Sequence, residues 1–278
     1  IMRIGKGEIM RIGKWRFDTE NQVYMMGILN VTPDSFSDGG RYDHMDRALF
    51  HAEELVKQGT DILDIGGEST RPNHIKITSE EEIERVCPII EAIKSRMDIP
   101  VSLDTYKSDV AKAGIAAGAD MINDIWGLKW DGTMAAVIAK GGVASCLMHN
   151  RKEAVYDNYL KDVVTDLQES LDMAKAAGMD MEQVCIDPGI GFAKNLEQNL
   201  SLMNHLEDLQ SLKYPVLLGT SRKSMIGLTL DLPVDQREEG TMATTVLGIM
   251  KGCSIIRVHD VEKNLRAAKM TLAMLRAE

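Results

Sequence analysis

Residues 24–30 read YMMGILN, an apolar run that ends abruptly in the amide side chain of Asn30. A short apolar run that stops at a polar residue is typical of a buried parallel strand with a functional group at its C-terminal end. Three later stretches share this arrangement: Asp104 in VSLDT, Asp187 in CIDPGIGF, and Arg257 with His259 in IIRVHD. Because the C-terminal strand ends of an α/β barrel lie on one face, the recurrence predicts that these side chains converge.

Eight strand-like segments can be counted along the chain, with helical patterns between them. They are residues 24–30, 61–65, 100–104, 120–124, 143–149, 184–187, 215–219 and 254–259. No G-x-G-x-x-G motif follows the first segment, so an open dinucleotide-binding sheet is not indicated. We therefore predict an α/β fold, a (β/α)8 barrel in a single domain that spans residues 1–278.

The predicted helices rest on apolar residues that recur at helical spacing. The second helix has the clearest start, because Ser79 and Glu82 match the spacing of a capping box. Pro88 lies within this helix and predicts a kink. Helices are expected at about residues 48–56, 79–97, 110–117, 133–140, 158–177, 196–209, 241–251 and 265–275.

The first 23 residues precede the barrel pattern. The sequence IMRIGK occurs at residues 1–6 and again at residues 9–14. We predict a β-hairpin extension over residues 1–23 that closes the bottom of the barrel. No stretch here is typical of a signal peptide, and no later run approaches the roughly 18 apolar residues of a membrane span.

The charge balance and the cysteines narrow the function classes. A net charge of -10 argues against a nucleic acid or an anionic membrane as partner. Small anionic ligands remain compatible, because a few Arg and Lys side chains can dominate the local field. The four cysteines lie far apart without C-x-x-C pairing, which indicates neither a zinc site nor a disulfide framework. We expect a reducing, cytoplasmic setting.

Three hydrogen-bond acceptors are expected together at the barrel mouth. Asp104, Asn123 and Asp187 end the third, fourth and sixth predicted strands. They suit a flat ring with several N–H donors, because one carboxylate can accept two parallel N–H groups. A single strand-end Asp could equally cap the next helix or bond a neighbouring loop. The recurrence at three strands favours a binding pocket.

Positive charge is expected from three other strand ends, through Arg71, Lys223 and Arg257. Phosphate sites in such barrels often use the loops after the seventh and eighth strands, which indicates a substrate with oxyanion groups. Arg71 or Lys223 taken alone could also be a solvated surface residue. Arg257 directly follows an apolar run, so its guanidinium requires a buried partner.

Two further features remain open on the residues alone. The loop that follows Asn30 ends in Gly39-Gly40 and contains Phe36, a pattern typical of a lid over an apolar ligand. His149 and His259 also end strands. Either histidine could act as a base or make a structural hydrogen bond.

Eight motifs together closely resemble those of the dihydropteroate synthase family, pterin-binding barrel enzymes of folate biosynthesis. They occur in the family's order, which makes chance similarity implausible. Asn73 is a small departure, because the family more often has Gly after Thr-Arg-Pro. The motifs are GILNVTPDSFSDGG, DIGGESTRP, SLDTYK, INDIWG, LMHNR, DPGIGFAKN, GTSRKSMIG and RVHDV.

The resemblance implies a transferase that condenses 6-hydroxymethyl-7,8-dihydropterin diphosphate with p-aminobenzoate and releases pyrophosphate, with pyrophosphate leaving first. It implies Mg²⁺ as cofactor, with Asn30 at the metal position, and a homodimer. The catalytic residues that it implies are Asp104, Lys223 and Arg257. Asp187 would bind the 2-amino and N3–H edge of the pterin, and Arg257 would stack on the ring.

The resemblance also implies which residues surround each substrate. Those around the pterin and its diphosphate are Thr70, Arg71, Asp104, Asn123, Met148, Asp187, Phe192, Lys223, Arg257 and His259. Those around p-aminobenzoate are Phe36, Thr70, Arg71, Pro72, Phe192, Ser221 and Lys223.

Two alternatives share the acidic pocket. A pterin-dependent methyltransferase of the same barrel family would have no evident use for the anion-binding loops at residues 70–72 and 221–223. A catalytically silent pterin-binding homologue would not need the full set of polar residues. Pyrophosphate release that depends on magnesium and on both substrates would separate all three.

Overall fold

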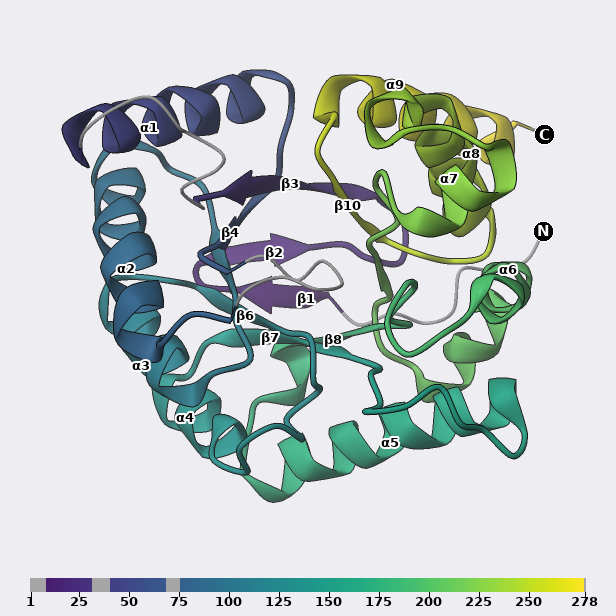
Figure 1. Ribbon diagram of the computed structural model, residues 1–278, viewed down its shortest axis with the longest axis horizontal. Coiled ribbons are helices and arrows are strands. Elements are labelled where there is room, and N and C mark those ends of the chain that lie inside the picture. The colour runs from purple at the N-terminus through teal and green to yellow at the C-terminus, as the bar shows by residue number, and fades with distance from the viewer. Residues whose placement is uncertain (1–8, 32–40, 69–75, 278) are drawn as a thin grey trace.

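The computed structural model describes residues 9–31, 41–68 and 76–277. In these ranges, eight parallel strands form one sheet in the order β8-β7-β6-β5-β4-β3-β10-β9. A bridge from Ile186 in β8 to Val216, beside β9, brings the two edges together, so the sheet curls into a nearly closed barrel. The helices surround the strands as a ring (Figure 1). The predicted (β/α)8 architecture is confirmed.

The barrel strands lie close to the predicted segments. Their bounds are β3 (Tyr24–Asn30), β4 (Ile62–Gly66), β5 (Val101–Asp104), β6 (Met121–Asp124), β7 (Ala144–Met148), β8 (Val184–Asp187), β9 (Leu217–Leu218) and β10 (Ile255–Val258). The seventh barrel strand, β9, is much shorter than its predicted five residues.

Within the described ranges, the outer ring contains the predicted helices and one more. The bounds are α1 (Arg41–Lys57), α2 (Ser79–Arg96), α3 (Ser108–Ala116), α4 (Met134–Gly141), α5 (Tyr159–Ala176), α6 (Leu196–Asn204), α7 (Ser224–Leu230), α8 (Glu238–Met250) and α9 (Val261–Arg276). The extra helix is α7, which directly follows Lys223. The helix expected at 196–209 ends at Asn204 and continues as a 3-10 helix at Leu206–Leu212. Two shorter 3-10 turns lie at Met181–Gln183 and Val234–Gln236.

The predicted cap of α2 was wrong by one residue. Thr78, not Ser79, is the N-cap, and its hydroxyl accepts a hydrogen bond from the Glu81 backbone N–H at 3.2 Å. Glu82 is buried and accepts a hydrogen bond from Lys107. Glu82 therefore binds Lys107 and does not take part in a capping box with Ser79. The helix is continuous through Pro88.

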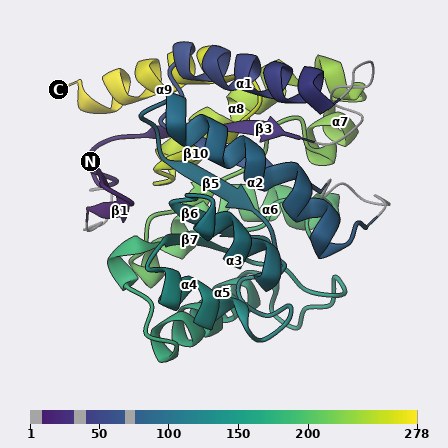
Figure 2. The same ribbon diagram turned by 90° about the vertical axis from the view of Figure 1, so that its left-hand side faces the viewer.

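The N-terminal hairpin consists of β1 (Met10–Ile12) and β2 (Trp15–Phe17), paired antiparallel. It contains the second copy of the repeated hexapeptide, whereas the first copy lies outside the described residues. Met10, Ile12 and Phe17 are buried against residues at or near the starts of several barrel strands, among them Ile62 and Met121. Figure 2 shows β1 at the end of the barrel where the strands begin. The hairpin thus closes the bottom of the barrel, as predicted, and leaves the opposite end for the site.

The main core lies between the sheet and the surrounding helices. Apolar residues of the strands, such as Leu63 and Leu103, pack there against Val86, Ile90 and Ile93 of α2. Burial of these side chains is the main favourable contribution to folding. Among the described helices, none combines the length and apolar character needed to cross a membrane.

Candidate active site

The C-terminal ends of adjacent strands bring several predicted site residues side by side. Asn30 of β3 pairs in register with Gly66 of β4, Gly66 pairs with Asp104 of β5, and Asp104 pairs with Asn123 of β6. On the other side of the mouth, Met148 of β7 pairs with Asp187 of β8. The predicted convergence of the strand ends on one face is therefore present in the structure.

Arg257 joins strands that are not neighbours in the sheet. Its Nε donates to Asp64 Oδ2 at 2.6 Å, and its Nη2 donates to Asp104 Oδ2 at 2.6 Å. Asn123 Nδ2 donates a longer hydrogen bond, 3.4 Å, to the same Asp64 oxygen. The buried partner that the sequence required for Arg257 is thus a pair of carboxylates.

The electrostatics of Asp104 are set by burial. Burial raises the pKa of Asp104 to about 7, opposed by the Arg257 guanidinium and reinforced by the carboxylates of Asp64 and Glu82. The carboxylates of Asp64, Asp104 and Asp187 raise the pKa of Arg257 and outweigh the effect of its own burial. The site therefore holds a permanent cation beside a carboxyl group that changes charge near neutral pH.

Two carboxylate oxygens of this group have unmatched hydrogen-bonding capacity. Within the described residues, Asp64 Oδ1 and Asp104 Oδ1 are buried and accept no hydrogen bond. A buried acceptor without a donor costs about 1–3 kcal/mol. A ligand that presents N–H groups at this point would recover that free energy on binding. The arrangement suits the N–H-rich ring expected from the sequence.

Asp187, the last residue of β8, and Lys223, directly before α7, lie on the opposite side of the mouth. Asp187 Oδ1 accepts a hydrogen bond from the Gly189 backbone N–H at 2.6 Å. Lys223 Nζ donates to the Ile190 carbonyl and lies 4.8 Å from the centre of the Phe192 ring. Burial raises the pKa of Asp187 and lowers the pKa of Lys223 to about 8, while their mutual attraction opposes both shifts.

An apolar wall lies at the same end of the barrel, formed by residues at or after the ends of β5, β6, β7 and β8. Tyr106, Ile125 and Met148 form a buried cluster, against which Trp126 and Phe192 pack. Met148 and Phe192, which the sequence placed beside the same ligand, are therefore in one cluster. Such a wall can cover a flat ring while the carboxylates bind its edge.

The last strand and the seventh loop bring Ser221 and His259 together. Ser221 Oγ lies 2.9 Å from His259 Nδ1 and also accepts a hydrogen bond from the His259 backbone N–H at 3.2 Å. Both residues belong to the groups that the sequence placed near anionic substrate atoms. Phe36, Thr70, Arg71, Pro72 and the divergent Asn73 lie outside the described residues.

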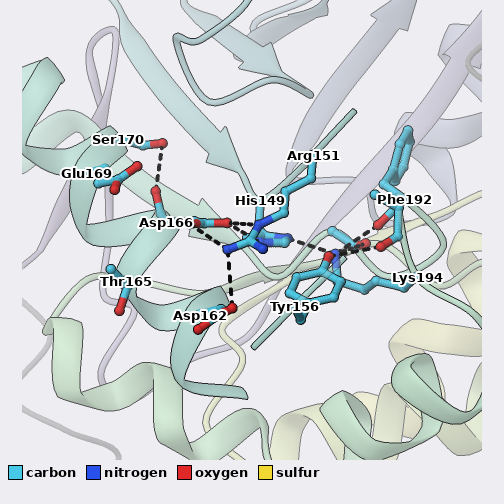
Figure 3. A network of polar contacts seen from close by, with 12 residues as sticks. His149, Arg151, Tyr156, Asp162, Thr165, Asp166, Glu169, Ser170, Phe192 and Lys194 are labelled. Atoms are coloured by element: carbon cyan, nitrogen blue, oxygen red, sulfur yellow. Dashed lines mark hydrogen bonds and ion pairs between the residues drawn. The ribbon is translucent and has the colours of Figure 1, made fainter. Parts of the chain in front are cut away.

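Both ring nitrogens of His149 contact other side chains of the protein. Its Nε2 lies 3.0 Å from Asp166 Oδ2 and its Nδ1 lies 2.8 Å from Lys194 Nζ (Figure 3). Burial lowers the pKa of His149 to about 4, although the hydrogen bond to Asp166 favours its charged form. Of the two roles left open by the sequence, the contacts favour the hydrogen-bonding one.

Residues 26–259 match the family described as pterin binding enzymes. The chain belongs to this family. A curated dihydropteroate synthase of Clostridium beijerinckii is 57% identical over 268 residues, which is 96% of this chain and 100% of that protein. The dihydropteroate synthase of Bacillus subtilis is 54% identical and covers 92% of this chain and 90% of its own length.

Solved structures of the family share the barrel. A crystal structure of dihydropteroate synthase from Clostridium difficile in the presence of pteroic acid has a TM-score of 0.92 and 50% identity, and covers 94% of this chain and 100% of its own. A Xanthomonas albilineans dihydropteroate synthase with 4-aminobenzoic acid has a TM-score of 0.92 and 38% identity, and covers 98% of this chain and 100% of its own. The family resemblance predicted from the motifs is confirmed.

Within this pterin-binding barrel, reasoning from strand ends missed Asp64. It lies inside the apolar run of β4 and is fully buried. A carboxylate in such a run is itself a signal, because buried charges are almost always paired. Lys194 was also missed, since the motif that contains it drew attention to Asp187 and Phe192.

Reasoning from strand ends also missed a group of hydrogen-bonded side chains beside the segment that follows β4. Lys107 Nζ donates to Glu68 Oε2 at 2.6 Å and to Glu82 Oε2 at 2.8 Å, and Tyr106 donates to Glu68. Glu68 also accepts a hydrogen bond from the Ile77 backbone N–H. This buried network fixes both flanks of residues 69–76.

Proposed function

We infer that the chain is a transferase that condenses 6-hydroxymethyl-7,8-dihydropterin diphosphate with p-aminobenzoate to give 7,8-dihydropteroate and pyrophosphate, a step of folate biosynthesis. The observation that carries this function is the paired Asp64 and Asp104 around Arg257 at the barrel mouth, in a chain 57% identical to a dihydropteroate synthase. The pterin-dependent methyltransferase is disfavoured, because the curated relatives over most of the chain are synthases.

We assign the pterin to the acceptor-rich side of the mouth. Asp187 would accept from the 2-amino and N3–H groups, with Asn123 beside it, because a carboxylate matches two parallel donors. Met148 and Phe192 would cover the ring. Arg257 would face the ring from the last strand while Asp64 and Asp104 hold its guanidinium.

We assign the diphosphate of the pterin substrate and the p-aminobenzoate to the loops that carry cationic side chains. Arg71, Thr70 and His259 would bind diphosphate oxygens. The p-aminobenzoate slot would be framed by loop residues from four strands: Phe36, Thr70, Arg71, Pro72, Phe192, Ser221 and Lys223. Support comes from the Ser221–His259 contact and from Lys223 above the Phe192 ring.

The residue types account for a dissociative reaction. The bond from the pterin methylene to the diphosphate oxygen breaks first, and both electrons leave with pyrophosphate. Lys223 would stabilise the growing negative charge, and the Asp104 carboxylate would stabilise the cation left on the pterin. The arylamine nitrogen then attacks the methylene carbon and loses a proton to solvent. A neutral arylamine is already nucleophilic, so this step needs no strong base.

We propose Mg²⁺ as the cofactor. Asn30 Oδ1 lies beside Asp104 at the mouth: a Cβ built on Gly66 would be 3.5 Å from Asn30 Oδ1 and 3.9 Å from Asp104 Oδ2. Mg²⁺ prefers oxygen ligands and often binds through one or two protein oxygens together with substrate phosphates and water. Asn30 fits that pattern. When bound, the ion would neutralise charge on the departing pyrophosphate.

We also propose a homodimer in a reducing cytoplasm. The late helices expose Met250 on α8 and Met270, Met274 and Leu275 on α9, which a second copy could cover. The reducing setting is proposed because the four cysteines lie far apart in the sequence and show no C-x-x-C pairing. Sedimentation equilibrium would measure the oligomeric state, and a monomer at micromolar concentration would contradict the dimer.

Release of pyrophosphate tests the reaction. The purified chain should release it only when the dihydropterin diphosphate, p-aminobenzoate and Mg²⁺ are all present. Release with the pterin and water alone would indicate a hydrolase. Pterin binding without any turnover would indicate a silent homologue, and methyl transfer from a methylated pterin would support the methyltransferase.

A further inference from the structure

Lys194 lies in the loop between β8 and α6, with its ammonium group directed back into the protein. Its Nζ lies 2.8 Å from His149 Nδ1, 2.9 Å from the Gly189 carbonyl oxygen and 2.9 Å from the Phe192 carbonyl oxygen. Figure 3 shows Lys194 and His149 in line with Asp166. One side chain thus connects two carbonyls of the loop that follows Asp187 to a residue at the end of β7.

The protonation states of this group follow from the neighbours of His149. The Nε2 atom faces the Asp166 carboxylate at 3.0 Å, so Nε2 carries the hydrogen and donates it. The Nδ1 atom then has a lone pair and accepts. Lys194 must therefore donate three hydrogen bonds, which an ammonium can do and a neutral amine cannot.

The groups that face Lys194 from the surrounding elements shift its pKa in opposite directions. Burial lowers the pKa of Lys194 to about 7, with Lys223 and Arg151 acting in the same direction and Asp187 and Asp166 opposing them. His149 stays neutral in this range. Asp166 stays ionised, because hydrogen bonds from His149 and Arg151 outweigh its burial and lower its pKa.

The loop held by Lys194 carries active-site contacts. The Gly189 N–H donates to Asp187 Oδ1, and the next carbonyl, of Ile190, accepts from Lys223. The backbone is pressed tightly against β7, since Gly189 has a φ of 68° and an added Cβ would lie 1.9 Å from the His149 carbonyl oxygen. Movement of the Gly189 or Phe192 carbonyl would therefore move Asp187, Lys223 or the Phe192 ring.

We propose that Lys194, oriented by His149 and Asp166, is a positioning residue that holds the loop 188–192 in its pterin-binding geometry. The proposal rests on the proposed function, because it assigns the pterin to Asp187 and Phe192. Its protonated form makes all three contacts. Loss of the proton leaves one acceptor unmatched and loosens the loop, so pterin affinity should fall as the pH rises through the pKa of Lys194.

Binding of pteroic acid by calorimetry, measured between pH 6 and pH 8.5, tests this role. The Lys194→Met variant keeps the length and apolar stem of the side chain but cannot donate. The ratio of its dissociation constant to that of the wild-type chain should be about ten at pH 6 and should approach one at pH 8.5. Taking the ratio cancels the titration of the probe itself. Lys140→Met, on the exposed face of α4, should give a ratio of one throughout.

A ratio that is constant with pH would overturn the proposal, because a purely structural contribution of the lysine stem does not titrate.

If Lys194→Met fails to fold, the variants Asp166→Asn and His149→Gln test the role of Lys194 instead. Asp166→Asn removes a charge that favours the ammonium, so the pH at which the affinity falls should move downward, and an unchanged midpoint would reject the role. His149→Gln keeps an acceptor for Lys194 and should bind more tightly than His149→Leu at pH 6; equal affinities would also reject it. A wild-type chain that binds no pteroic acid would instead contradict the proposed function.

Discussion

Arg257 Nη2 donates a 2.6 Å hydrogen bond to Asp104 Oδ2 and so links β10 to β5, two strands that are separated in the sheet by β3 and β4. The same guanidinium binds Asp64 on β4 through Nε. Arg has a planar fork of donors and stays charged, so it can hold two buried carboxylates at fixed positions. The position of the Asp104 carboxylate therefore depends on Arg257 and, through Arg257, on Asp64.

Removal of Asp64 should destabilise the protein. Asp64→Ala leaves Arg257 with one buried carboxylate fewer, and breaking a buried ion pair typically costs about 3–5 kcal/mol. We expect a loss of about 3 kcal/mol in the free energy of unfolding, measured with urea. Asp235→Ala, on an exposed turn, is the control and should change the value by less than about 0.5 kcal/mol. Equal effects of the two substitutions would contradict the pairing.

The protonation of Asp104 should appear in the pH dependence of stability. Its pKa in the folded state is about 7, well above the ordinary value of 3.8, because burial outweighs the attraction of Arg257. The folded state then holds the proton more tightly than the unfolded chain. The associated stability is fully present below about pH 4 and is lost as the pH rises towards 7. The unfolding free energy of the wild-type chain minus that of Asp104→Asn should fall across this window, and a constant difference would refute the assignment.

Loss of the negative charge at Asp187 should weaken pterin binding. Asp187→Asn replaces one acceptor of the proposed bidentate contact with a donor, at a cost of about 2–4 kcal/mol in binding free energy. Calorimetry with a pterin measures the change. Asp172→Asn, on the exposed face of α5, should bind like the wild-type chain. Unchanged affinity in Asp187→Asn would reject the proposed pose.

Lys223 should matter for turnover and for the second substrate. Lys223→Ala removes the cation beside Asp187 and above the Phe192 ring. We expect kcat/KM for p-aminobenzoate to fall about 100-fold or more, as is usual when a group that stabilises developing charge is lost. Steady-state kinetics at saturating pterin measures this. Lys175→Ala, in the last turn of α5, is the matched surface change, and a comparable loss there would undo the assignment.

The hairpin should contribute to stability but not to the site. Phe17 is buried and lies edge-on to Tyr24, with ring centres 4.8 Å apart. Phe17→Ala should lower the unfolding free energy by about 3 kcal/mol because it leaves a cavity under the barrel. Pterin affinity should not change. Ile9→Ala, half exposed at the same end, should have little effect on either quantity.

The sequence predicted most of the fold because each barrel strand is a short apolar run followed by a helical pattern. It failed where local signals were ambiguous. Thr78 and Ser79 are adjacent potential caps, and Glu82, the acid expected in the capping box, instead accepts a hydrogen bond from Lys107. The helix α7 was missed because seven residues give too short a periodic pattern to separate from a loop.

The candidate site was predicted from polar residues at strand ends, so functional residues that do not end a strand were missed. Asp64 lies inside β4 and becomes meaningful only when Arg257, 193 positions later, is placed beside it. Lys194 likewise gains a role only through His149 and Asp166, which lie on other elements. Motifs identify residues that act directly, whereas supporting residues are defined by contacts that span the fold.

Because β9 has two residues, few backbone pairs join this part of the barrel to its neighbours. We call the contacts of β9 and Val216 with β10 and β8 the seam of the barrel. Two register pairs join β9 to β10, and a single bridge at Val216 joins that side to Ile186, the residue before Asp187. Local opening requires the fewest broken backbone contacts at this seam, so amide hydrogens there should exchange with deuterium sooner than those between β3 and β4. Occupancy of the mouth would slow that exchange, which makes the seam a natural reporter of ligand binding.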